Sequence, residues 1–200
     1  MTLGRMIQVA LMDDHPAVLA GLRRLIEPEP DLRIVGAAPT APALAAQLGN
    51  LRPDVLVLDF DLARGDGLTY CRRIKDRPVP PRVVIYSAYA SPGLALAARV
   101  ADADALVDKT EPVPNLLTAI RWAAEGRTAL PLLPRHAYEA AVSRLDDDDL
   151  PVLAMLLEGE PTAAIAEALR TDGAEIAWRT QRILGRLAPR SRTYSEEKAA

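Results

Sequence analysis

The most informative segment of the chain is Asp54-Val55-Leu56-Val57-Leu58-Asp59, in which four apolar residues in a row end in a carboxylate. Pro53 precedes the segment and Gly65-Asp66-Gly67 follows it, so turn residues bound the apolar run on both sides. A short apolar run of this kind is typical of a strand that is buried on both faces in a parallel sheet. Open α/β sheets bind their ligands at the carboxyl ends of such strands, which puts Asp59 where chemistry is expected.

Composition narrows the class of protein before any motif is considered. Of the 200 residues, 50% are hydrophobic, which is enough for a substantial core, and the net charge of −3 gives no general attraction to nucleic acid. The single cysteine, Cys71, excludes an internal disulfide and suits a reducing compartment. There is no basic leader with a cleavage site and no apolar run of about 18 residues. We therefore expect a soluble, cytoplasmic protein.

Strand and helix patterns alternate along the first part of the chain. Each apolar strand segment is followed by a segment with helical spacing of its apolar residues, and Pro or Gly residues separate many of them. The predicted strands are Ile7–Met12, Leu32–Ala38, the Asp59 segment, Arg82–Ser87 and Ala105–Val107, and the predicted helices are Pro16–Ile26, Ala41–Leu48, Gly67–Lys75, Pro92–Val100 and Pro112–Glu125. This alternation predicts an α/β fold with a doubly wound, five-stranded parallel sheet.

The alternation stops at Gly126, and a different pattern follows. A segment with two prolines, Thr128–Pro134, is predicted to be an extended linker that leads into a helix over Arg135–Arg144. Three short helical patterns come next, over Leu150–Leu157, Thr162–Leu169 and Ala174–Leu187. Short helices joined by a tight turn that contains glycine are typical of a helix-turn-helix. The predicted division is a first domain at 1–125, a linker at 126–145 and a small all-α domain at 146–200.

Five polar residues follow the predicted strands at their carboxyl ends. They are Asp13, Asp14, Asp59, Ser87 and Lys109. Each of them alone fits a solvated turn or a helix cap, but in a parallel sheet these strand ends meet at one edge. Carboxylates this close repel one another unless a cation lies between them, and oxygen ligands of this kind suit Mg²⁺. An aspartate beside a metal ion can attack a phosphoryl group to give an acyl phosphate, and a lysine and a hydroxyl would then contact the phosphoryl oxygens.

With these positions, the chain resembles the receiver domain of bacterial response regulators. The resemblance is carried by Asp13-Asp14-His15-Pro16, by the Asp59 strand with Asp66-Gly67-Leu68 after it, by Ser87-Ala88 and by Lys109. The opening motif and Gly126 resemble the NarL/FixJ branch of this family. The resemblance implies that Asp59 accepts phosphate from a sensor histidine kinase.

The resemblance also implies roles for the other residues at this edge. Asp13, Asp14, Asp59 and the backbone carbonyl of Asp61 would hold Mg²⁺, whereas Ser87 and Lys109 would sense the phosphoryl group. The family usually has Tyr or Phe, which acts as a rotating switch, three residues before the lysine. Leu106 occupies that switch position here, so we expect the relay from the phosphorylation site to be altered. His15 and Cys71 are interpreted as structural.

The C-terminal segment resembles a LuxR-type helix-turn-helix in a degenerate form. Leu153, Ile165-Ala166, Leu169 and the run from Ile183 to Leu187 carry this match. It implies that a homodimer binds double-stranded promoter DNA and regulates transcription. The residues predicted to meet DNA are Ala177, Trp178 and Gln181 at the bases and Arg179, Arg182 and Arg186 at the phosphates.

Two alternatives to a DNA-binding regulator remain open. In the first, the arginines pair with acids of the same domain, and the tail is a dimerisation or protein-partner module in which Trp178 packs at an interface. The run Asp146–Asp149 is expected to be a solvated helix start in either case, because negative charge there favours the helix dipole. In the second, Asp59-Phe60-Asp61 imitates the aspartate pair of haloacid-dehalogenase-like phosphatases. Such enzymes need a further acidic pair on a strand end after the lysine, and since none is predicted, we do not expect an enzyme.

Overall fold

The computed structural model of the chain describes residues 5–48, 51–62, 65–88 and 90–188, with only the backbone of 65 and 66. Its strands are β1 (Ile7–Met12), β2 (Leu32–Ala38), β3 (Val55–Asp59), β4 (Asp61–Leu62), β5 (Gly65–Asp66), β6 (Arg82–Ser87) and β7 (Ala105–Asp108). Its helices are α1 (Pro16–Ile26), α2 (Ala41–Leu48), α3 (Gly67–Lys75), α4 (Pro92–Val100), α5 (Val113–Ala124), α6 (Arg135–Val142), α7 (Leu150–Leu157), α8 (Thr162–Ala168) and α9 (Gly173–Leu187). No helix within these ranges combines the length and the apolar character needed to cross a membrane.

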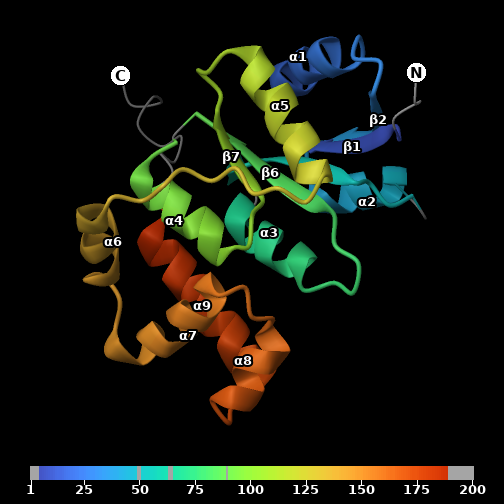
Figure 1. Cartoon of the computed structure of the whole chain (residues 1–200). Helices are drawn as coiled ribbons and strands as arrows, with labels where there is room; N and C mark the ends of the chain where they lie inside the picture. Colours follow the sequence, from blue (N-terminus) through green and yellow to red (C-terminus); the bar gives the residue numbers. More distant parts are fainter. Residues whose placement is uncertain (1–4, 49–50, 63–64, 89, 189–200) are drawn as a thin grey trace, which may run out of the picture.

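Five of the strands form one parallel sheet in the order β2-β1-β3-β6-β7, with β3 at its centre (Figure 1). Leu56 of β3 pairs with Ala10 of β1 on one side, and Leu58 pairs with Ile85 of β6 on the other. The consecutive apolar residues of β3 suit this place, because a central strand has neighbours at both edges and helices on both faces. The predicted α/β fold with a doubly wound, five-stranded parallel sheet is confirmed.

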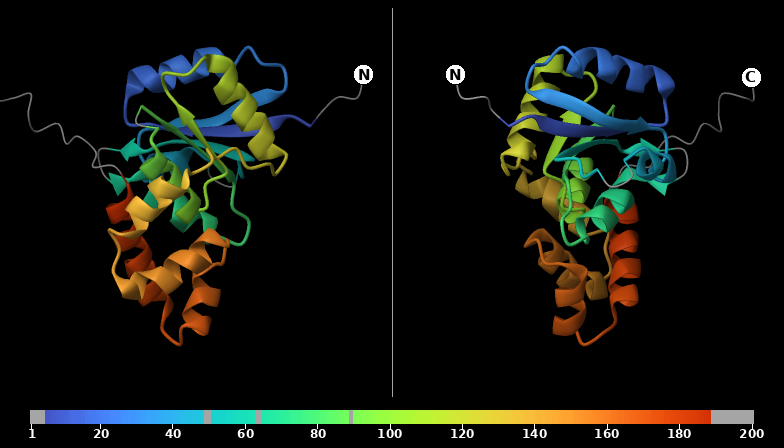
Figure 2. Two further views of the ribbon diagram at one scale, coloured as in Figure 1. Left: turned by 60° about the vertical axis from the view of Figure 1, so that its left-hand side comes forward. Right: turned by 90° about the vertical axis from the view of Figure 1, so that its right-hand side faces the viewer.

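Each face of the sheet has its own layer of helices, because alternate residues of a strand point to opposite faces. Val55 and Val57 belong to an apolar cluster that includes residues of α1 and α5. Leu56 and Leu58 point the other way, into a cluster with residues of α2, α3 and α4. The two layers lie on either side of the sheet in Figures 1 and 2. The strand ends between these layers are therefore the accessible places on the sheet.

The connection after β3 contains a two-stranded antiparallel hairpin of β4 and β5, which the sequence analysis did not predict. Helix α3 begins directly after this hairpin at Gly67, whose N–H donates a hydrogen bond to the carbonyl oxygen of Phe60 (3.0 Å). A Cβ atom at Gly67 would overlap the backbone oxygen of Asp59. Glycine is needed at this position because any side chain would push α3 away from the end of β3.

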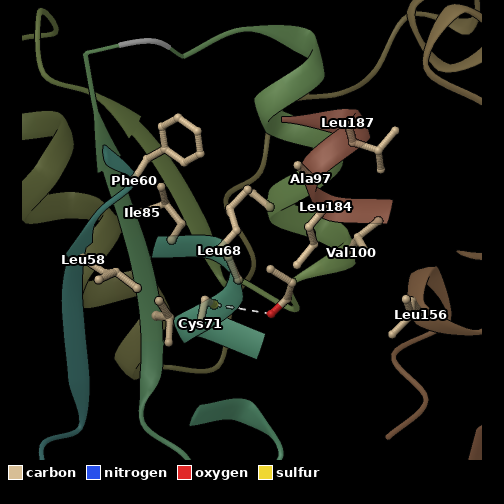
Figure 3. Packing of buried hydrophobic residues seen from close by; sticks show 14 of the residues in the cluster. Leu58, Phe60, Leu68, Cys71, Ile85, Ala97, Val100, Leu156, Leu184 and Leu187 are labelled. Carbon is tan, nitrogen blue, oxygen red and sulfur yellow. Dashed lines mark hydrogen bonds between the residues drawn. The ribbon is translucent and has the colours of Figure 1, made fainter. Parts of the chain in front are cut away.

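The C-terminal helices pack on α4 as well as on one another. Leu184 and Leu187 of α9 lie beside Ala97 and Val100 of α4 in Figure 3, and all four residues belong to one buried cluster. Helix α4 is consequently covered on two sides, by the sheet and by α9. We refer to this packing of α4 and α9 as the shared core. The sequence analysis did not predict it, because it expected a separate C-terminal domain.

Polar contacts reinforce the shared core at its edge. The guanidinium of Arg72 in α3 donates a hydrogen bond to the carbonyl oxygen of Glu160 (3.0 Å), and the hydroxyl of Thr162 donates to the carboxylate of Asp76 (2.9 Å). Cys71, on the same helix, is fully buried, and its thiol donates to the carbonyl oxygen of Ala101 (3.3 Å; Figure 3). Burial raises the pKa of this thiol, which therefore stays protonated and acts as a packing residue.

Candidate phosphoacceptor site and C-terminal surface

Neighbouring strands bring the predicted site residues to one edge of the sheet. Asp13 follows β1, Asp59 ends β3, Ser87 ends β6 and Lys109 follows β7, and these four strands are parallel and consecutive in the sheet. Asp13 and Asp59 are only 1% and 4% exposed. Carboxylates buried to this extent need hydrogen-bond donors or a cation to replace the water that they have lost.

Lys109 supplies that charge to both carboxylates. Its Nζ lies 2.6 Å from Oδ2 of Asp13 and 3.0 Å from Oδ1 of Asp59. Burial raises the pKa of Asp59, the charge of Lys109 opposes this rise, and the negative charge of Asp13 adds to it. Burial would lower the pKa of Lys109, but the hydrogen bond to Asp13 and the charge of Asp59 outweigh burial, so its pKa is raised and the amine is cationic.

The same edge offers a group of atoms that could hold a metal ion. Asp13, Asp14, His15 and Asp59 each contribute one ligand atom, and these four atoms lie within 4.8 Å of one another. His15 was interpreted as structural, but its Nδ1 lies 2.9 Å from Oδ1 of Asp14. The carboxylate of Asp61 is not in this group, although burial and the charge of Asp14 raise its pKa. A set of ligands dominated by carboxylate oxygens, with excess negative charge, fits a hard divalent cation.

Two of the residues expected to relay the signal, Ser87 and Leu106, are buried on the same side of the sheet, because side chains alternate along β6 and Ile85 belongs to the cluster of Leu106. Ser87 is fully buried at the end of β6, and Leu106 of β7 is buried on the face that α4 covers. Tyr86 packs on the opposite face, with α1 and α5, and the Nζ of Lys109 lies 5.6 Å from the centroid of its ring. The sequence analysis missed Tyr86, although an aromatic residue directly before the strand-end serine was a visible signal.

Arg179 and Arg186, predicted to meet DNA phosphates, pair with acids of the C-terminal segment. Nε of Arg179 donates to a carboxylate oxygen of Glu175 at 2.7 Å, and Nη1 of Arg186 lies 2.8 Å from a carboxylate oxygen of Asp146. The hydrogen bond to Glu175 raises the pKa of Arg179, and the hydrogen bond from Arg186 lowers the pKa of Asp146. Contact with DNA would require both arginines to exchange these carboxylates for phosphates.

The third arginine, Arg182, compensates a buried acid. Asp149 is 0% exposed, so the prediction that Asp146–Asp149 is a solvated helix start is wrong for this residue. Arg182 donates two hydrogen bonds to the carboxylate of Asp149, one of them from Nε at 3.1 Å. The guanidinium of Arg182 also lies over the ring of Trp178, 4.5 Å from its centroid. Arg182 thus holds the exposed indole of Trp178 in place and at the same time neutralises the buried carboxylate of Asp149.

Two further residues with a predicted role in DNA binding lie next to the first part of the chain. Ala177 and Gln181 are exposed, but they line a small hollow whose other walls include Arg72 and Arg73 of α3 and Asp76, which follows this helix. Helix α3 therefore occupies part of the space in front of the helix that would read DNA. The structure brings the sheet-edge residues together, whereas it separates the predicted DNA-binding residues onto different sides of α9.

Comparison with known proteins agrees with this fold. A family model described as the response regulator receiver domain matches residues 9–121. The DNA-binding transcriptional activator DevR/DosR of Mycobacterium tuberculosis is 30% identical over 95% of this chain and 92% of its own length. The nitrate/nitrite response regulator protein NarL of Escherichia coli is 25% identical over 92% of this chain and 90% of its own length. A solved complex of the response regulator RcsB with DNA shares 25% identity and a TM-score of 0.60, covering 90% of this chain and 91% of that chain.

The fold and the sheet edge together define the receiver class of phosphoacceptor domain. The family model covers more than half of the chain, and the relatives match along nearly its whole length. The chain therefore belongs to the two-component response regulators, in the NarL/FixJ branch, and the resemblance found in the sequence is confirmed.

Proposed function

We propose that this protein is phosphorylated on Asp59 by a sensor histidine kinase and regulates transcription by binding promoter DNA as a homodimer in the cytoplasm. The observation that carries this proposal is the buried pair of Asp13 and Asp59 with Lys109 between them. We further propose a receiver domain at 1–125, a linker at 126–145 and a DNA-binding domain at 146–200.

The geometry supports a direct phosphoryl transfer to the Asp59 carboxylate. One of its oxygens would attack the phosphorus of a phosphohistidine, so that a P–O bond forms while the P–N bond breaks. The imidazole leaves with the bonding electrons and takes up a proton from solvent. Lys109 would move its charge to the new phosphoryl oxygens, and the hydroxyl of Ser87 would donate to another.

A divalent cation fits the acidic group at this edge. Asp13, Asp14, Asp59 and the backbone carbonyl of Asp61 would hold Mg²⁺, with His15 close enough to orient Asp14. When bound, Mg²⁺ neutralises charge on the phosphoryl oxygens. The contribution of the chain itself is to hold the carboxylates at a fixed spacing while the sheet excludes water behind them.

Labelling with acetyl phosphate and Mg²⁺ tests the acceptor. The wild type should incorporate one phosphoryl group, and Asp59→Asn should incorporate none. Asp102→Asn is the matched control, because Asp102 lies outside the sheet edge and its positive φ of 60° is one that asparagine also adopts. Labelling that survives Asp59→Asn would refute the assignment.

The relatives of this chain support DNA binding. DevR/DosR is named as DNA-binding, and RcsB is seen in complex with DNA, and both match this chain along its length. If Arg179, Arg182 and Arg186 meet phosphates, roughly three counterions leave per subunit, and the log–log salt slope should be about −2.7 per subunit. Electrophoretic mobility of the protein on its own upstream DNA, with and without acetyl phosphate, measures this.

One observation favours a second candidate function, a C-terminal module that binds a protein partner. The three arginines already have acidic partners, so they are not arranged as a ready phosphate-binding row. Asp146→Asn separates the two candidates, because it removes the nearest carboxylate partner of Arg186 (2.8 Å) without removing a cation. A DNA-binding protein should then bind duplex more tightly, whereas a partner module should bind none even at low salt.

A further inference from the structure

A second hollow lies on the same face of the sheet as α3 but at the opposite end from Asp59. It has a volume of about 720 Å³ and lies between α2 and α3. Ala10 and Leu56 form its floor on the sheet, and Leu44 and Ile74 form its walls. This volume is within the range of about 300–1,000 Å³ that is typical of small-molecule sites.

The sequence explains why this space is not filled. Helix α2 contributes Leu44, Ala45 and Leu48 to the lining, and the small side chain of Ala45 leaves space that a larger residue would occupy. On the floor, Ala10 of β1 pairs with Leu56 of β3, and its small side chain leaves space above the sheet. On the third side the chain passes through Pro78 and Pro81, whose rings fix φ and restrict the loop. The small side chains of Ala10 and Ala45 therefore leave this space open.

The polar groups of the hollow are few, and the charged ones share a sign. Arg52 and Arg77 are both exposed and line its mouth, and none of the lining residues that the structure describes is Asp or Glu. Neither arginine forms an ion pair with another residue that the structure describes. The half-buried Tyr70 also lines the hollow. Burial raises the pKa of Tyr70, against the charges of Arg77 and Arg73, so its hydroxyl is neutral and able to donate a hydrogen bond.

We propose that this cavity binds an amphipathic organic anion, a single-chain fatty carboxylate, with its chain between α2 and α3 and its head group at Arg52 and Arg77. The apolar floor and walls suit a hydrocarbon chain, and the two guanidinium groups suit a carboxylate. A sugar or a base would find too few polar partners, because among the described residues of the lining only Tyr70 and the two arginines have polar side chains. This site is independent of Asp59 and of the phosphotransfer proposed above.

Isothermal titration of the full-length protein with decanoate tests the site. Binding should saturate at one decanoate per chain, and decanol, which has the same chain without the charge, should bind on the order of tenfold more weakly. If decanol binds as tightly as decanoate, the two arginines do not bind the carboxylate, and the proposal is refuted. A titration that never saturates would refute the site.

Two matched pairs of variants locate the binding. Ala45→Trp should fill the hollow and abolish decanoate binding, whereas Ala46→Trp, on the neighbouring exposed position of α2 outside the lining, should not. Arg77→Ala should weaken binding on the order of tenfold, whereas Arg24→Ala, on α1 across the sheet, should leave it unchanged. Phosphoryl labelling of Asp59 should persist in all four variants and shows that each is folded. Equal losses within either pair would overturn the proposal.

Discussion

At the scale of single residues, Lys109 compensates two carboxylates that water hardly reaches. Lys109→Met should lower the free energy of unfolding in metal-free buffer by roughly 3–5 kcal/mol, because one partner of a buried charge pair is lost. The loss should be larger at pH 7 than at pH 5. Burial already raises the pKa of Asp59, and without Lys109 it rises further, so the folded state binds more protons and its stability falls as pH rises. Urea titrations at the two pH values measure the difference.

The double variant Lys109→Met with Asp59→Asn is the control for this prediction. Asparagine has no charge to compensate, so the double variant should recover part of the lost stability and should show a weaker dependence on pH. If Lys109→Met loses the same stability at both pH values, the lysine acts through packing and not through its charge.

Gly67 gives a second prediction at this scale. Gly67→Ala should destabilise the protein by about 1–3 kcal/mol or more, because the new Cβ would overlap the backbone oxygen of Asp59 and α3 would have to move. Gly21→Ala on α1 is the matched control. A Cβ there meets nothing within 4 Å, so alanine should be neutral or stabilise the helix by roughly 0.5–1 kcal/mol. Thermal unfolding of both variants checks the contrast, and equal effects would contradict it.

At the scale of elements, the sequence predicted the sheet and its edge because both depend on local patterns. The bounds of β1, β2 and β6 agree with the predicted strands, since buried strands have distinctive apolar runs that turn residues interrupt. The sequence was sufficient to predict that Asp13, Asp59 and Lys109 lie close together, because the carboxyl ends of neighbouring parallel strands lie at one edge of the sheet. The burial of Asp149 was not predictable in this way, because it depends on Arg182, which is distant in sequence.

Helix α4 gives a prediction about the relay. Leu106 provides no ring that could follow Ser87 inward, and α4 is held by the sheet on one side and α9 on the other. Phosphorylation should therefore change hydrogen exchange across residues 92–100 only slightly. Mass spectrometry of exchange with and without beryllofluoride measures this. A large change in protection would show that coupling to α4 needs no aromatic ring.

At the scale of the whole molecule, the shared core should make the two halves of the chain unfold together. The two tryptophans report on one half each: Trp122 lies in α5 and Trp178 in α9, at 38% and 52% exposure. The variants Trp122→Phe and Trp178→Phe should therefore show the same urea midpoint when followed by the remaining indole. Two separate midpoints would show that the halves are independent.

Substitution in the shared core also tests whether the two halves of the chain unfold together. Leu187→Ala, at a fully buried position of α9, should cost about 2–5 kcal/mol and lower the midpoint reported by Trp122 as well as that reported by Trp178. Leu132→Ala, at an exposed position of the linker, should change neither. An effect of Leu187→Ala on the Trp178 signal alone would confine the role of this leucine to the C-terminal helices.

The covering of α4 on two sides also has a consequence for how this protein can change over generations. Ala97 is fully buried and lies beside Leu184 and Leu187 (Figure 3), so a larger residue there would disturb the packing of both halves of the chain at once. A larger residue at Ala97 should therefore be tolerated where Leu184 or Leu187 becomes smaller with it. Descendants of this chain should inherit the two halves as a matched pair, and a receiver taken from one lineage should not be interchangeable with that of another.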